Sequence, residues 1–288
     1  MRIASFLTAV VLLILSFAAA LADDTAAYLP PAGYDQKQEG VEYYTLQAKS
    51  YYSTTCGKFR DCLVYLPAGY NPETAYPVLY LLHGIGGNHL EWTGGKPDVI
   101  LGNMLAEGTA VPMIVVTPNI KAFPSGVSSS NIYSQETFKA FDNFINDLRD
   151  DLMPFIRENY NILEGRENTA VAGLSMGGRE ALYIGLKMQD TFGYVGAFEP
   201  APGVLAYFNE GGLFTEDEFK LRDDLDTFVM IVAGTWDNVV GTFPKTYSDT
   251  LTKNGSAHVF YETQGGHDFT VWKNGLYNFA KCIFGAGK

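Results

Sequence analysis

Residues 173–177 read Gly-Leu-Ser-Met-Gly and directly follow a short apolar run at residues 169–172. A G-x-S-x-G sequence between a buried strand and a helix is typical of a sharp turn that exposes a serine nucleophile, here Ser175. The same residues also suit a plain glycine-rich turn, and so short a pattern arises by chance in many chains. Nucleophilic chemistry at Ser175 therefore requires a base, an acid and an oxyanion-binding turn elsewhere in the chain.

A serine hydroxyl needs a base that removes its proton, and histidine commonly has this role. The chain has four histidines, and two of them, His83 and His89, precede Ser175. When a G-x-S-x-G turn carries the nucleophile, the base comes last in the chain, after the acid. His258 begins a predicted strand, where a structural role is more common, whereas His267 lies in a glycine-rich loop directly after that strand. We therefore predict that His267 is the base.

The base in turn needs a carboxylate that orients it. This acid should lie between Ser175 and His267, just after a strand. The β-branched and aromatic run at residues 227–233 ends in Gly-Thr-Trp-Asp, which places Asp237 in this position. The other acids near this run precede it or fall in a predicted helix, and we interpret them as surface charges: Asp224, Asp226 and Asp249.

A tetrahedral intermediate needs two backbone N–H groups that stabilise its oxyanion. One comes from the residue after the nucleophile, Met176. We place the other at Ile85, in the turn His-Gly-Ile-Gly-Gly at residues 83–87, which makes His83 structural. A phosphate-binding turn is the alternative, but no lysine followed by serine or threonine occurs there at the required spacing.

Strand-like and helix-like segments alternate after residue 60. Continuous apolar strands between helices predict an α/β fold, with a mostly parallel central sheet and helices on both faces. Residues 38–53 alternate in polarity and are expected to form antiparallel N-terminal edge strands. The predicted strands are residues 62–66, 76–82, 113–116, 169–174, 192–198, 227–233 and 259–262. The predicted helices are residues 97–105, residues 135–158, one that begins at Met176, and one after the last strand.

The longest predicted helix covers residues 135–158, where apolar residues recur every three or four positions. Pro154 is expected to kink or break this helix near its end. Its acids are interpreted as a solvated face: Asp142, Asp147, Asp150 and Asp151.

Two glycine- and proline-rich stretches, residues 119–131 and 199–224, follow predicted strand ends. The carboxyl ends of parallel strands surround the ligand crevice of an open α/β sheet, so both stretches are predicted pocket walls. For any single residue in them, a plain surface loop is the alternative. Trp92, in the loop after the turn at residues 83–87, is a further candidate for the substrate wall.

The N-terminus has the pattern of a secretory signal peptide. Arg2 precedes an almost wholly apolar stretch at residues 7–21, and Ala-Leu-Ala at residues 20–22 fits the cleavage pattern. We expect removal of residues 1–22, secretion out of the cell, and a single domain over residues 23–288; a retained signal anchor is the alternative. The formal net charge of −12 argues against a nucleic-acid partner, whose phosphates would be repelled.

The three cysteines are Cys56, Cys62 and Cys282. Cys56 and Cys62 flank a turn-like stretch between two strand-like runs, and an oxidising compartment permits disulfides. We therefore predict a Cys56–Cys62 disulfide and a free thiol at Cys282. The cysteines have no spacing typical of a metal site.

Several of these motifs together resemble carbohydrate esterase family 1, an esterase D-like group, and above all its feruloyl esterase modules. The resemblance covers roughly residues 38–285. It rests on the motifs at residues 65–70, 83–87, 173–178, 234–237, 265–269 and 271–276.

This resemblance implies an α/β-hydrolase fold, a metal-free and cofactor-free mechanism, and the triad Ser175, Asp237 and His267. It further implies a feruloyl esterase that releases hydroxycinnamic acids from plant cell-wall arabinoxylan. From the predicted signal cleavage, we expect no stable membrane association. Acetyl xylan esterases and general acyl esterases share the motifs and remain alternatives. An acyltransferase with the same triad, or a non-catalytic carbohydrate-binding protein on this scaffold, is a further alternative.

Overall fold

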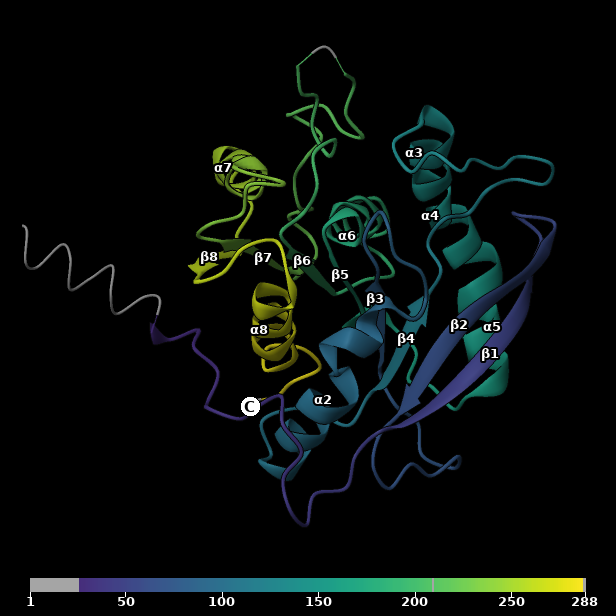
Figure 1. The fold of residues 1–288 in the computed structure, drawn as a ribbon, viewed down its shortest axis with the longest axis vertical. Coiled ribbons are helices and arrows are strands. Elements are labelled where there is room, and N and C mark those ends of the chain that lie inside the picture. The colour runs from purple at the N-terminus through teal and green to yellow at the C-terminus, as the bar shows by residue number, and fades with distance from the viewer. Residues whose placement is uncertain (1–25, 209, 287–288) are drawn as a thin grey trace, which may run out of the picture.

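The computed structural model describes residues 26–208 and 210–286. Within them, eight strands form one sheet in the order β1-β2-β4-β3-β5-β6-β7-β8 (Figure 1). The strands are β1 (Thr45–Ser53), β2 (Lys58–Leu66), β3 (Val78–Leu82), β4 (Ile114–Pro118), β5 (Thr169–Leu174), β6 (Tyr194–Phe198), β7 (Phe228–Gly234) and β8 (Val259–Thr263). β2 pairs antiparallel with both β1 and β4, and the other neighbours pair in parallel. The predicted mostly parallel sheet with an antiparallel N-terminal edge is confirmed.

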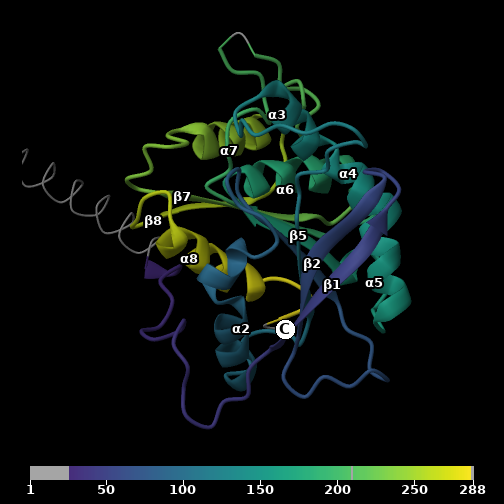
Figure 2. The same ribbon diagram turned by 45° about the vertical axis from the view of Figure 1, so that its right-hand side comes forward.

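Helices cover both faces of this sheet, as Figures 1 and 2 show. One face carries α2 (Pro97–Ala106) and α8 (Phe269–Ala280), and the other carries α6 (Met176–Lys187) and α7 (Phe243–Lys253). Alternate side chains of a strand point to opposite faces, so β3 contributes to both cores. Leu79 and Leu81 pack in the core under α2 and α8, while Tyr80 and Leu82 pack in the core under α6.

The segment predicted as one helix over residues 135–158 is divided into four pieces. These are α3 (Gln135–Asp142), α4 (Phe144–Asp147), a π-helical turn (Leu148–Leu152) and α5 (Met153–Asn159). Pro154 has no backbone N–H and cannot complete the regular hydrogen-bond ladder, so the helix widens in the turn before it. The disturbance expected at Pro154 is thus confirmed, and the continuous helix is not.

The interpretation of the acids on this segment as a solvated face is wrong for Asp147 and Asp151, which are both buried. Asp147 forms an ion pair with Arg60 of β2, with 3.1 Å between Nε and Oδ2. Asp151 accepts hydrogen bonds from the backbone N–H groups of Thr54 and Thr55, in the turn between β1 and β2. The two carboxylates therefore fasten the β1–β2 hairpin to the helical layer.

The predicted Cys56–Cys62 disulfide is wrong, since the structure holds both cysteines, and Cys282, as free thiols. Cys56 lies in the turn before β2, whereas Cys62 lies roughly 13 Å along β2 from the start of that strand at Lys58. A bridge needs Cα atoms within about 7 Å of each other. Burial raises the pKa of the Cys62 thiol to about 12, which keeps it protonated and unreactive.

The predicted signal peptide at residues 1–22 lies outside the described residues. Among the residues that are described, no helix has the combined length and apolar character that a membrane crossing requires.

Candidate active site

Ser175 sits on a strained turn between β5 and α6. Its backbone has φ of 52° and ψ of −117°, in a region that residues with a Cβ rarely adopt. The carbonyl oxygen of Phe198, at the end of β6, accepts a hydrogen bond of 2.9 Å from the N–H of Ser175. Both features match the strand-to-helix turn predicted for a nucleophile, and they hold the serine at the carboxyl edge of the sheet.

The glycines around Ser175 allow the backbone to approach itself closely. A Cβ at Gly177 would lie 2.4 Å from the carbonyl oxygen of Leu82, at the end of β3. A Cβ at Gly173 would lie 2.4 Å from the carbonyl group of Gly177. A side chain at either position would push α6 away from the sheet, so the motif is required by packing as well as by chemistry.

The structure brings Ser175, Asp237 and His267 together as predicted from their order in the chain. His267 Nε2 lies 2.8 Å from Oγ of Ser175, and its Nδ1 lies 2.7 Å from Oδ2 of Asp237. A carboxylate only accepts hydrogen bonds, so Nδ1 carries the proton and Nε2 is free to accept from the serine hydroxyl. This is the arrangement in which histidine acts as a base toward serine.

Asp237 remains ionised although it is largely buried. Burial opposes its charged form, but hydrogen bonds from His267 and from the N–H groups of Val240 and Val239 hold the pKa of Asp237 below its usual range. The two backbone N–H groups reach Oδ1 at 3.0 and 2.7 Å, which leaves Oδ2 for His267. The carboxylate is thereby fixed in the orientation that holds the imidazole.

Ile85 and Met176 offer the two N–H groups predicted for the oxyanion hole. Neither group donates a backbone hydrogen bond within the described residues, so both are available to a ligand. The turn that carries Ile85 lies against the nucleophile, because a Cβ at Gly84 would be 3.5 Å from Cβ of Ser175. The Glu91 carboxylate fixes this turn by accepting the N–H of Gly84 at 2.6 Å.

His83 is structural, as its place upstream of Ser175 suggested. It is buried, with Nδ1 at 2.7 Å from the carbonyl oxygen of Gly84, and Nε2 accepts the N–H of Ile120 at 2.9 Å. Burial lowers the pKa of His83 to about 3, which keeps the ring neutral. The ring therefore joins the oxyanion turn to the loop that follows β4.

The prediction that Trp92 lines the substrate wall is wrong. Trp92 is 0% exposed, and its indole N–H donates to the carbonyl oxygen of Leu82 at 2.9 Å. A short 3₁₀ helix (Glu91–Gly95) turns the ring inward, where it meets the edges of Phe198 and Phe269. It is a core residue beneath the site.

Sequence reasoning missed two residues beside the triad. Trp236 is 61% exposed and directly precedes Asp237 in the chain, a signal that the sequence did contain. Glu199 is fully buried, and its Oε2 lies 3.6 Å from Nδ1 of His267. The sequence has no comparable signal for Glu199, because only the pairing of β6 with β7 brings it to Asp237.

A cavity of about 450 Å³ opens beside the first turns of α6. Its wall includes Pro202, next to Ala201, whose N–H donates to the carbonyl oxygen of Ser175 at 3.0 Å. The loop at residues 199–224 therefore contributes to the wall of a cavity, as predicted, although no residue of the triad lines that cavity. Three aromatic side chains contribute to the lining: Tyr133, Phe138 and Tyr207.

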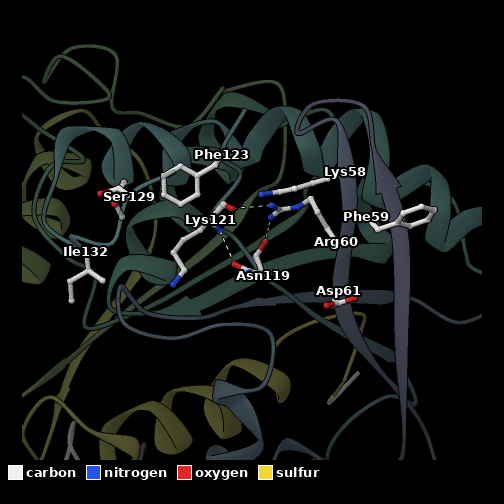
Figure 3. Close-up of a pocket in the computed structure, with 10 residues that line it drawn as sticks. Lys58, Phe59, Arg60, Asp61, Asn119, Lys121, Phe123, Ser129 and Ile132 are labelled. Atoms are coloured by element: carbon white, nitrogen blue, oxygen red, sulfur yellow. Dashed lines mark hydrogen bonds between the residues drawn. The ribbon is translucent and has the colours of Figure 1, made fainter. Parts of the chain in front are cut away.

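A second cavity, of about 360 Å³, lies between the start of β2 and the loop at residues 119–131, the other predicted wall (Figure 3). Lys58, Lys121 and Phe123 are part of its lining. Figure 3 shows the guanidinium of Arg60 beside this loop, where it donates to the carbonyl oxygens of Asn119 and Lys121. Arg60 thus ties the base of the loop to the hairpin.

Known proteins share both the sequence pattern and this fold. The sequence model of a family described as "Putative esterase" matches residues 53–280. The chain belongs to this esterase family. The esterase is 28% identical over 253 residues to an endo-1,4-beta-xylanase/feruloyl esterase of Xylanibacter ruminicola, covering 86% of this chain but only 32% of that protein. It is 29% identical to an acetyl esterase of Caldicellulosiruptor saccharolyticus, over 71% of each chain.

Among solved structures, the esterase resembles a CE1 ferulic acid esterase from Anaeromyces mucronatus in complex with ferulic acid. The two are 40% identical, with a TM-score of 0.84, over 91% of this chain and 98% of that one. A feruloyl esterase module from Clostridium thermocellum, 18% identical with a TM-score of 0.66, shares the fold. The predicted α/β-hydrolase fold is therefore confirmed, and the chain is a carboxylic-ester hydrolase.

Proposed function

We propose that this esterase is a feruloyl esterase that releases hydroxycinnamic acids from acylated plant cell-wall polysaccharide. The observation that carries the proposal is the 40% identity to a ferulic acid esterase along nearly its whole chain, together with the complete triad. The aromatic-lined cavity near Ser175 supports it, since about 450 Å³ falls within the range of small-ligand sites.

The proposed reaction proceeds through an acyl-enzyme. His267 takes the proton of Ser175 as Oγ attacks the ester carbonyl carbon, and the N–H groups of Ile85 and Met176 stabilise the oxyanion. Asp237 stabilises the imidazolium that forms. His267 then gives its proton to the departing sugar oxygen, and a water molecule, deprotonated by the same ring, hydrolyses the acyl-serine.

We also propose that the enzyme acts outside the cell. The support is the signal-peptide pattern of residues 1–22 and the polymeric nature of the proposed substrate. A fusion of residues 1–22 to a reporter enzyme in a secreting host should deliver the reporter to the medium. Retention of the reporter inside the cell would contradict extracellular action.

The catalytic assignment is tested by Ser175→Ala, which should fold normally and lose hydrolysis of methyl ferulate. Ser248→Ala is a matched control, because Oγ of Ser248 lies 2.8 Å from Nε2 of His258, the same separation as in the triad. The control should retain turnover and labelling by a fluorophosphonate probe, and Ser175→Ala should lose both. Near-normal turnover by Ser175→Ala would refute the assignment.

The acyl specificity is tested by comparing kcat/KM for methyl ferulate, methyl p-coumarate and acetylated xylan. We expect the two hydroxycinnamates to be preferred. A preference for acetylated xylan would instead identify an acetyl esterase, the activity named for the Caldicellulosiruptor relative. Transfer of the acyl group to added alcohols in place of hydrolysis would identify an acyltransferase.

A further inference from the structure

Glu199 is a buried carboxyl group beside the triad that the mechanism above does not use. It is 0% exposed, and its Oε2 lies 3.6 Å from Nδ1 of His267. One oxygen of Glu199, one of Asp237 and one ring nitrogen of His267 all lie within 4.8 Å of one another. The group is therefore close enough to influence how Asp237 and His267 meet.

The surrounding backbone is shaped to hold this side chain inward. Glu199 has φ of 49°, a left-handed conformation that is unfavourable for a residue with a Cβ. Its N–H donates to the carbonyl oxygen of Val232 on β7 at 2.7 Å, which secures that conformation. Gly234 provides the space, because a Cβ there would lie 2.3 Å from Oε1 of Glu199. Strain of this kind persists where the fold enforces it, and it clusters at functional sites.

The hydrogen-bond donors and acceptors around Glu199 indicate its protonation state. Both of its carboxyl oxygens and Nε1 of Trp272 are buried without a hydrogen-bond partner in the structure. Among the described residues, no arginine or lysine forms an ion pair with Glu199, and an unpaired buried carboxylate is costly. Asp237 and Trp272 are the side chains beside Glu199 that could form hydrogen bonds with it. One proton on Glu199 satisfies all three atoms, because its O–H can donate to Asp237 while its other oxygen accepts from Trp272.

We propose that Glu199 is a positioning residue of the triad, a neutral carboxylic acid that donates a hydrogen bond to Asp237 and holds its carboxylate against His267. This inference rests on the serine esterase chemistry proposed above, and it does not depend on which acyl group is removed. The ionisable groups that face Glu199 are Asp237, His267 and Asp268, from the ends of β7 and β8.

The charge balance of the site agrees with this geometry. Burial, and then the negative charge of Asp237, raises the pKa of Glu199 to about 10. Two carboxylates this close do not both remain ionised without a compensating cation. A second negative charge at 3.6 Å from Nδ1 would favour the imidazolium form of His267, which cannot accept the serine proton. A neutral Glu199 orients Asp237 without this penalty.

Two nearly isosteric variants separate this role from the alternatives. Glu199→Gln keeps a neutral N–H donor for Asp237 and an oxygen acceptor for Trp272, whereas Glu199→Met keeps the volume and loses both. The assay is the pH profile of kcat and KM on 4-nitrophenyl acetate, a small ester that needs no particular acyl pocket. Circular dichroism and thermal unfolding verify that each variant folds.

We expect Glu199→Gln to retain kcat/KM within about threefold of the wild type, because a neutral group replaces a neutral group. The acidic limb of its pH profile should lie at the same pH as in the wild type. Glu199→Met should lose kcat by up to about 10²-fold with little change in KM, because the base is misplaced. An acidic limb that moves by about one pH unit or more in Glu199→Gln would show an ionised Glu199 and overturn the proposal. Wild-type kcat in a folded Glu199→Met variant would also overturn it.

An infrared measurement covers the case in which Glu199→Met does not fold. At neutral pH the difference spectrum between the wild type and Glu199→Gln should show the C=O stretch of a protonated carboxyl group. The difference removes the contribution of Glu180, whose pKa burial raises to about 7. A difference spectrum without this band would mean an ionised Glu199, which contradicts the proposal. Because the band requires no turnover, it also separates a failure of this inference from a failure of the proposed esterase function.

Discussion

Acidification should weaken the fold through His83, and the size of the effect follows from the structure. The ring is buried with Nδ1–H donating to Gly84, and Nε2 accepting from the N–H of Ile120. A second proton on Nε2 would face the Ile120 N–H and break that contact. Folding therefore excludes a proton that the unfolded chain binds readily.

The sign and magnitude follow from linkage between protonation and folding. His83 has a pKa of about 3 when folded, against 6.5 for an unperturbed histidine, so between these values the unfolded chain binds more protons. Its contribution to stability is complete above pH 6.5 and is lost as the pH falls toward 3. Between pH 7.5 and pH 5.0 the free energy of unfolding should fall by about 2 kcal/mol through His83 alone.

Urea unfolding at these two pH values measures the effect. His83→Gln carries an amide that stays neutral, so its loss of stability on acidification should be smaller than that of the wild type by about 2 kcal/mol. His89→Gln, which removes another histidine from the same loop, is the control and should retain the wild-type loss. An equal loss in the wild type and in His83→Gln would refute the reasoning.

Three further predictions concern packing and redox state. Asp147→Asn should lower the free energy of unfolding by about 3–5 kcal/mol, because it leaves the buried guanidinium of Arg60 without its ion-pair partner. Asp150→Asn, which removes an exposed pair with Arg149, is the control and should change little in the same urea assay. Gly177→Ala should reduce thermal stability and turnover together, because the added methyl group would collide with the backbone at the end of β3. Gly86→Ala should leave the melting temperature unchanged, because a methyl group there would have no neighbour within 4 Å. Thiol titration of the denatured, unreduced protein should count three free cysteines; a count of one would restore the predicted disulfide.

The proximity of the three proposed triad residues could be predicted because a parallel sheet simplifies their placement. The carboxyl ends of parallel strands meet at one edge, so residues just past β5, β7 and β8 must lie near one another. Ser175, Asp237 and His267 each follow such an end, and their order in the chain matched one triad arrangement. Local sequence therefore sufficed for a site that is distributed over the whole chain.

The failed predictions depended on partners that local patterns do not contain. Asp147 has the same helical spacing as an exposed acid, and only its contact with Arg60, on the far hairpin, makes it a buried group. Cys56 and Cys62 are close in the sequence, but the extended strand β2 carries Cys62 away from the turn that holds Cys56. Composition does not reveal this separation. Glu199 follows a strand like many loop residues, and its burial arises from the register between β6 and β7.

The loop after β4 is hydrogen-bonded at its base and exposed to solvent at its tip. Arg60 holds the carbonyl oxygens of Asn119 and Lys121, His83 holds the N–H of Ile120, and the Asn143 amide donates to the carbonyl oxygen of Ala122 at 2.9 Å. Residues 124–128, by contrast, are all exposed.

Because the tip is exposed, insertions or replacements there are expected to leave the rest of the fold unchanged. Each doubling of the length of a flexible loop costs only about 0.6 kcal/mol of closure entropy. The hydrogen-bonded base separates such changes from the turn at residues 83–87, so the tip can change while Ser175, Asp237 and His267 keep their positions.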